Sequence, residues 1–157
     1  MLSGAVLRFS GAGMTPYSLT LERFANRIRN AQPAFEEMAD IFGKAQRQQF
    51  DRTGGYYGGL WKPLSPQYAA AKARTHPGKP IMVRDGQLRA DLTERPFGVE
   101  HISSQRMIVG TALDRARYHQ HGMGNNPTRT LIGKPPRSMN KQMSSVLHKF
   151  IVEGVPA

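Results

Sequence analysis

The sequence predicts an α+β fold in which amphipathic helices pack against a small antiparallel sheet, with a long, protruding glycine-rich loop. Two helical apolar stripes lie in the first third of the chain and another lies near its end. A pair of short β-rich runs lies between them. Since 157 residues are enough for one domain with a substantial core, we expect a single domain over residues 1–157.

The expected subdivisions follow changes in the residue pattern along the chain. We expect an N-terminal strand and arm over 1–17, a helical pair over 18–50, a glycine- and tryptophan-containing loop over 51–65, a sheet with loops over 66–137, and a C-terminal helix over 138–152. The strand in the arm is predicted from Val6 to Phe9, because this run is followed by Gly11-Ala12-Gly13.

The helical pair is predicted from apolar residues at helical spacing. The first stripe consists of Leu21, Phe24, Ala25 and Ile28, opposite three arginines. Pro33 suits the first turn of the second helix, which is expected to end near Phe50. The shared face of that helix consists of Phe35, Met38, Ala39, Phe42, Ala45 and Gln49. Both helices are therefore expected to bury one face.

The loop after the helical pair contains the chain's single tryptophan. Its glycines, from Gly54 to Gly59, cannot sustain a helix. Trp61 next to Pro63 gives one large apolar anchor beside a residue of fixed φ. Ser65-Pro66 then predicts the start of a short helix that continues to Thr75. Such a segment suits docking more than reaction.

The middle of the chain predicts a turn, an ambiguous segment and a hairpin. Asp85-Gly86 is a turn signal, and the following Leu88, Ala90 and Leu92 fit a strand or a helical face, so both types stay open. Phe97 to Ile102 and Arg106 to Gly110 predict a hairpin. After it we expect one or two helical turns from Ala112 to His121, closed by Gly122, and a final helix with Ser138 as N-cap.

Composition narrows the function classes. Lys and Arg number 22 against 11 Asp and Glu, so the net charge of +11 attracts anions, nucleic acid included. The basic residues are scattered, and no run resembles a basic arm. The absence of cysteine excludes disulfides, cysteine-bound zinc and thiol catalysis. No apolar stretch suits a signal peptide or a membrane span, so we expect no membrane association.

Candidate catalytic and metal-binding patterns are weak. His119 and His121 would point apart on a helix, and no carboxylate lies near them in sequence. The Gly54–Gly59 run lacks the lysine and hydroxyl residue of a P-loop, and Ser65 lacks a nucleophile-elbow context. The acids Asp85, Asp91 and Glu94 are flanked by arginines, so surface ion pairs explain them. We therefore expect no enzyme, metal or cofactor.

A nucleic-acid-binding module is one function class that the residues suit. Tyr56 and Tyr57 lie near Arg52 and Lys62, which combines stacking groups with positive charge. Such a module would bind through the basic surface without sequence preference. A lone species with a steep salt dependence of binding would favour it.

Five motifs, taken in order, resemble one known family. They are Trp61-Lys62-Pro63-Leu64-Ser65 with Tyr68 and Lys72, Ile81-Met82-Val83-Arg84-Asp85-Gly86-Gln87-Leu88, Ile108-Val109-Gly110, Tyr118-His119-Gln120-His121-Gly122, and Pro127-Thr128-Arg129-Thr130-Leu131-Ile132-Gly133. The order and spacing resemble the phage virion morphogenesis family, the tail completion proteins of tailed bacteriophages and Mu-like prophages. The resemblance covers roughly Phe35 to Ile151.

This resemblance implies a non-enzymatic subunit of a hexameric or dodecameric ring that joins tail to head. Its implied partners are copies of itself, portal or connector-side neck proteins, tail-tube or tail-terminator proteins, and genomic DNA in the lumen. It would lie in the virion neck or tail, and in the host cytoplasm during assembly. The candidate interface residues are Trp61, Pro63, Leu64, Gly86, Leu88, Tyr118, Gly122 and Arg129, and the candidate DNA-facing residues are Arg52, Lys62, Arg115 and Arg117.

Overall fold

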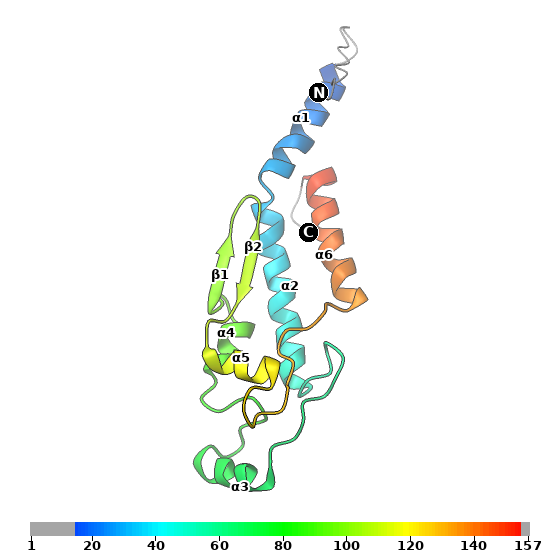
Figure 1. The fold of residues 1–157 in the computed structure, drawn as a ribbon. Helices are drawn as coiled ribbons and strands as arrows, with labels where there is room; N and C mark the ends of the chain where they lie inside the picture. The colour runs from blue at the N-terminus through cyan, green and yellow to red at the C-terminus, as the bar shows by residue number, and fades with distance from the viewer. Residues whose placement is uncertain (1–14, 155–157) are drawn as a thin grey trace, which may run out of the picture.

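The computed structural model describes residues 15–154 and is elongated (Figure 1). Its elements are α1 Thr15–Arg29, α2 Gln32–Asp51, α3 Pro66–Thr75, α4 Gln87–Thr93, β1 Val99–Ile102, β2 Met107–Gly110, α5 Asp114–His121 and α6 Arg137–Glu153. The predicted α+β class is therefore confirmed. The expected strand from Val6 to Phe9 lies outside the described residues.

Helix α2 is the central element of the core. The hairpin and α4 lie along one side of it and α6 along another (Figure 1). The predicted apolar face is buried at Ala39, Phe42 and Ala45, and Phe42 meets Phe97 edge to face with ring centroids 5.3 Å apart. This helix therefore organises the elements that carry the candidate site.

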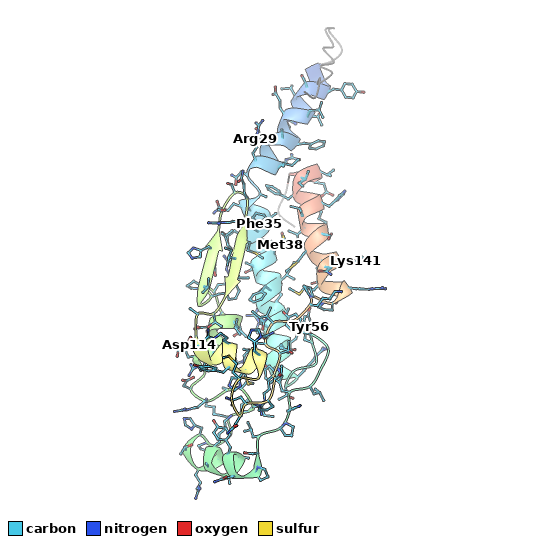
Figure 2. The ribbon with its side chains drawn as sticks, in the orientation of Figure 1. Arg29, Phe35, Met38, Tyr56, Asp114 and Lys141 are labelled. Atoms are coloured by element: carbon cyan, nitrogen blue, oxygen red, sulfur yellow. The ribbon has the colours of Figure 1, made fainter. Side chains whose placement is uncertain are left out.

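Helix α6 packs on the N-terminal half of α2. Ala34 of α2 joins Val146 and Phe150 in a second apolar cluster. Figure 2 shows Phe35 and Met38 on α2, in the part that lies beside α6, and both pack against this cluster. The predicted spacing of α6 is confirmed, but the predicted N-cap was wrong. The cap position is Pro136, which has extended backbone with a φ of −65°. The helix begins at Arg137, so Ser138 already lies in its first turn.

The predicted hairpin is confirmed. β1 and β2 pair antiparallel, with Val99 opposite Gly110 and Ile102 opposite Met107. Arg95, just before β1, forms ion pairs with Glu100 of β1 and with Glu36 and Asp40 of α2. These pairs fasten the hairpin to the central helix. Ile102, Met107 and Val109 pack against the main core.

The segment left open between strand and helix is the helix α4. Leu88 and Leu92, one helical turn apart, are 4% and 0% exposed, so both reach the core from one face of the helix. Gly86 precedes α4 with φ of 91°, a conformation that favours glycine. The predicted turn at Asp85-Gly86 therefore directs the chain into α4, which packs against α2.

The glycine-rich loop closes on itself, and its expected protrusion is not confirmed. Gly54 and Leu60 form an isolated β-bridge, and the Trp61 amide donates to the Thr53 carbonyl at 2.8 Å. A Cβ on Gly54 would approach the Gly59 carbonyl oxygen to 2.6 Å, so glycine is required where the two sides meet. Trp61 follows directly after this loop and is buried, with 5% of its surface exposed.

Helix α1 has the predicted apolar stripe, but only part of the stripe is covered. Leu21 and Ile28 are 66% and 60% exposed, whereas Phe24 and Ala25 are half-buried, and α1 extends beyond the rest of the molecule (Figure 1). Arg27 joins it to the end of α6 by donating from Nη1 to the carbonyls of Ile151 and Val152, at 2.8 and 2.9 Å. Among the described helices, none has the length and apolar character of a membrane span.

Candidate functional site

A cavity of about 740 Å³ lies beside α3, which is at the end of the molecule opposite α1 (Figure 1). Its lining residues come from four separate segments of the chain, within 62–72, 82–88, 115–119 and 125–129. They are Lys62, Pro63, Leu64, Ser65, Tyr68, Lys72, Met82, Val83, Arg84, Asp85, Leu88, Arg115, His119, Asn125, Asn126, Pro127 and Arg129. The walls therefore mix apolar side chains with five cations and one carboxylate.

Four of the five motifs singled out in the sequence meet at this cavity. The tryptophan motif contributes Lys62 to Ser65, and the second motif contributes Met82 to Asp85. His119 and Arg129 bring the fourth and fifth motifs. The motif at Ile108-Val109-Gly110 instead lines a second cavity of about 610 Å³ beside the hairpin and α5. Residues far apart in sequence thus form one surface, which makes the first cavity the candidate functional site.

Arg129 holds two sides of the cavity together. Its Nε donates to the Lys62 carbonyl at 2.8 Å and its Nη2 to the Pro63 carbonyl at 3.0 Å. Its amide donates to the His119 carbonyl at 2.8 Å. The side chain is buried, and burial lowers its pKa from the usual value. Arg129 therefore fixes the tryptophan motif against α5 and leaves a positive charge below the surface.

Lys72 is the second buried cation of the cavity. Its Nζ donates to the Pro80 carbonyl at 2.5 Å, which closes the turn between α3 and the following loop. Burial lowers the pKa of this amine. Exposed Lys62 and Arg84 line the same cavity, so positive charge extends from its interior to its rim.

Arg115 and Asp85 form the ion pair of the cavity wall. Two guanidinium nitrogens of Arg115 donate to the two carboxylate oxygens at 2.7 and 3.2 Å, and this hydrogen bonding lowers the pKa of Asp85. Nearby, burial lowers the pKa of His119, and the charges of Arg129 and Arg115 lower it further. The single acid of the cavity is thus already engaged.

Trp61 is an internal anchor in the isolated chain. Its ring meets Phe50 edge to face with centroids 5.3 Å apart, and its Nε1 donates to the Thr130 carbonyl at 2.7 Å. Gln49 Nε2 donates to the same carbonyl at 2.7 Å. The indole therefore pins the tryptophan motif to α2 and to the fifth motif. A direct role at an interface stays a prediction.

The other predicted interface residues divide between the surface and the framework. Pro63 is exposed, Leu64 is half-buried and both line the cavity, whereas Leu88 lines it from the core. Tyr118 is 41% exposed, with the Arg117 guanidinium 5.8 Å from its ring centroid. Gly122 ends α5 with φ of 69°.

Gly86 and Gly122 differ in how closely their surroundings approach. A Cβ on Gly122 would lie 2.5 Å from Thr128 Oγ1, whereas a Cβ on Gly86 would meet nothing within 4 Å. Gly122 therefore allows the fifth motif to pass close to the end of α5, and Gly86 serves backbone conformation alone.

The predicted DNA-facing residues do not form one cluster around the cavity. Lys62 and Arg115 line it, and Arg115 is held by Asp85. Arg117 lines the second cavity, and Arg52 is an exposed residue at the C-cap of α2. Their contact with DNA stays a prediction.

The tyrosine pair is partly built into the fold. Tyr56 and Tyr57 meet edge to face with centroids 5.1 Å apart, and Gln46 Nε2 donates to the Tyr57 hydroxyl at 2.9 Å. Burial raises the pKa of that hydroxyl. Figure 2 shows Tyr56 in the loop beside α2. Two half-buried rings packed against the core offer less stacking surface than the sequence suggests.

The weak catalytic patterns have structural explanations in the described part of the chain. Ser65 is the N-cap of α3 and accepts from the Tyr68 amide. No cluster of metal-binding side chains occurs within residues 15–154. Of the three flanked acids, Asp85 forms a surface ion pair, with the distant Arg115, whereas Asp91 accepts a hydrogen bond from Thr111 Oγ1 at 2.7 Å. None of the ion pairs within residues 15–154 includes Asp91 or Glu94.

Two long stretches of the sequence that lack acidic residues contribute to this site, although the motifs alone do not reveal them. Residues 52–84 and 115–152 contain no Asp or Glu. Their cations are Arg52, Lys62, Lys72, Arg74, Lys79 and Arg84 in the first stretch, and Arg115, Arg117, Arg129, Lys134, Arg137, Lys141 and Lys149 in the second. The fold brings parts of both stretches to one cavity. Scattered charge along the chain is thus concentrated in space.

Comparison with known families identifies the family of the chain. Residues 13–146 match the model of the phage virion morphogenesis family. The chain belongs to this family. The match covers all the lining residues of the cavity, and membership supports a structural role in the phage virion. No match was found among curated proteins or among solved structures.

Proposed function

We propose that this member of the phage virion morphogenesis family is a tail completion subunit, which forms a hexameric or dodecameric ring joining the tail to the head. The ring would lie at the neck, between connector-side proteins and the tail tube or its terminator. Its role would be structural, without a catalytic step. Family membership supports the virion role, and the uncovered stripe of α1 supports assembly with neighbouring subunits.

The stripe of α1 is the observation that carries the ring proposal. Leu21 and Ile28 of the stripe are 66% and 60% exposed on a helix that extends from the body (Figure 1), and Tyr17, one turn before Leu21, is 71% exposed. Exposed apolar patches on otherwise soluble proteins mark interaction sites. A contact between this stripe and a different face of the next copy is heterologous, and such contacts close into rings when the rotation permits.

Passage of DNA through the ring is a second part of the proposal. A net charge of +11 attracts phosphates without sequence preference, and a lumen lined by some of these cations would suit the passage of DNA. Arg52, Lys62 and Arg117 are the exposed candidates for this contact. The alternative of a nucleic-acid module using Tyr56 and Tyr57 has less support, because both rings pack against the core.

The test is the mass of the purified chain in solution, by light scattering and native mass spectrometry. We expect six or twelve copies per particle for the parent, and smaller species for the double variant Leu21→Ser, Ile28→Ser. The matched control is Arg23→Ser, because Arg23 is exposed on α1 outside the stripe. A monomeric parent with a steep salt dependence of binding to random duplex would replace the ring by the nucleic-acid module.

A further inference from the structure

Two buried cations of the first cavity have no carboxylate partner. Lys72 and Arg129 are 7% and 5% exposed. Their donors meet only backbone carbonyls among the hydrogen bonds of residues 15–154, those of Pro80, Lys62 and Pro63. Neither forms an ion pair within the same range, and Asp85 is held by Arg115. Two positive charges therefore line one recess without compensation.

Such an arrangement is costly in the isolated chain. Charged groups are almost never buried without a partner, because desolvation outweighs what backbone carbonyls return. The cost falls when an opposite charge enters the same low-dielectric space. The cavity also keeps Lys62 and Arg84 at its rim, so a negative group is attracted before it enters.

We propose that this cavity binds a carboxylate side chain, presented with an apolar neighbour on a segment of a partner virion protein. The carboxylate would lie between Lys72 and Arg129, and the apolar neighbour would cover the wall formed by Leu64 and Met82. The identification of the partner as a virion protein rests on the proposed function. The charge chemistry rests on the cavity itself.

The shape of the site favours a side chain over the DNA backbone. The two uncompensated cations lie inside a recess whose walls include Leu64, Tyr68 and Val83. A duplex presents its phosphates across exposed cations at a surface and offers no apolar group for such walls. A glutamate or aspartate on a peptide reaches into a recess and brings apolar neighbours with it.

The uncovered helix of a second copy is a poor occupant. Helix α1 has exposed apolar residues, but Glu22 is its single acid against Arg23, Arg27 and Arg29. A net positive helix would be repelled by a cavity with five cations and one acid. We therefore assign the cavity to a different, acidic partner and the α1 stripe to contacts between copies.

The test is titration of the isotope-labelled full chain by NMR with blocked peptides. The probe is acetyl-Gly-Leu-Glu-Leu-Gly-amide, and its control has Gln in place of Glu. We expect the Glu peptide to bind at least about tenfold more tightly and to shift the signals of the cavity residues. A 12-base-pair duplex and inorganic phosphate are titrated in parallel.

Three variants locate the binding. Lys72→Met and Arg84→Ala should each weaken binding of the Glu peptide by about tenfold or more, whereas Lys79→Met should leave it unchanged. Lys79 is exposed in the loop that follows α3, but it does not line the cavity. Without peptide, Lys72→Met should unfold at an equal or higher temperature, because a buried charge has been removed.

Several results would overturn the proposal. Equal binding of the Glu and Gln peptides would do so, as would tighter Lys72-dependent binding of the duplex or of phosphate. Loss of the ring in Lys72→Met would assign the cavity to a second copy. The masses of the parent and of the variant are measured in the same samples, so an intact parent ring that binds no Glu peptide would refute this inference and leave the proposed function standing.

Discussion

Helices α1 and α2 carry the same kind of apolar stripe, and the fold covers the two stripes to different extents. On α2, Ala39, Phe42 and Ala45 are between 0% and 6% exposed. On α1, Leu21 and Ile28 are at least 60% exposed. The hairpin, α4 and α6 cover α2, whereas α1 extends beyond the body and meets the end of α6 (Figure 1).

The difference shows that an apolar stripe of helical period predicts a helix, but does not predict which element or subunit packs against the stripe. The period fixes which residues share a face. Burial depends on whether another element of the chain lies opposite. For α2 the covering elements come from the same chain, and for α1 the proposed function assigns the exposed residues to contact with a neighbouring subunit. Under that proposal, the comparison is one between a folding face and an assembly face.

The largest effect should come from truncating the covered face. Phe42→Ala should lower the free energy of unfolding by about 3–5 kcal/mol, because it removes a buried ring and its edge-to-face contact with Phe97. Leu21→Ala on α1 should change it by less than about 0.5 kcal/mol in the dissociated chain. Urea denaturation of dilute samples, followed by circular dichroism, measures both.

The concentration dependence of the same experiment tests the assembly face. If the proposed ring forms at higher concentration, Leu21→Ala should become destabilising there, since burial in a partner stabilises only the assembled state. If Leu21→Ala cost as much as Phe42→Ala in the dilute chain, α1 would be covered by its own chain in solution. The distinction between the two faces would then be lost.

Local patterns predicted the helices and the hairpin because each depends on spacing and turn residues close in sequence. Ser65-Pro66 starts α3 where expected, and Gly122 ends α5 in a left-handed conformation. The segment of Leu88 and Leu92 stayed open, because those two residues fit a strand and a helical face alike. Packing of both leucines against the α2 core decided it.

The cavity could not be predicted from local patterns, because its lining residues are assembled by tertiary contacts. The sequence marked Trp61 as a docking anchor, but its environment depends on Phe50 and Thr130. The burial of Lys72 and Arg129 is likewise a property of the fold. The motifs themselves did identify the segments that meet there, although each motif taken singly was weak.

A smaller effect should follow from loosening the hairpin that covers α2. Arg95→Met should lower the free energy of unfolding by about 1–2 kcal/mol, because Arg95 joins Glu100 of β1 to Glu36 and Asp40 of α2. Urea denaturation at pH 7 measures it. The matched control is Arg106→Met, an exposed arginine in the hairpin turn whose side chain carries none of these pairs.

The ion pair between Arg95 and Glu100 should also make the free energy of unfolding depend on pH. Hydrogen bonding to Arg95 lowers the pKa of Glu100, so folding favours its ionised form. The stabilisation is present above the unfolded pKa of about 4.3 and is lost as the pH falls through the lower folded pKa. Between pH 7 and pH 3 the parent should therefore lose more unfolding free energy than Arg95→Met. Equal losses would contradict the assignment.

The smallest effect concerns the connection that holds α1 to the body. Arg27 donates to the carbonyls of Ile151 and Val152, and its guanidinium lies 6.0 Å from the Phe24 ring centroid. Arg27→Ala should cost about 0.5–1.5 kcal/mol locally, because it leaves terminal carbonyls of α6 without this donor. Amide hydrogen exchange should accelerate in α1 and in the last turn of α6, while α2 keeps its protection.

The control for this change is Arg29→Ala, since Arg29 bonds to Asn26 within the same helix and is exposed. If exchange in α1 followed global unfolding in both variants, the helix would be part of the main cooperative unit. The uncovered stripe would then be a fixed surface. Faster exchange in Arg27→Ala alone would make α1 a separately opening element, whose orientation a neighbouring subunit of the proposed ring would set by covering its exposed apolar residues.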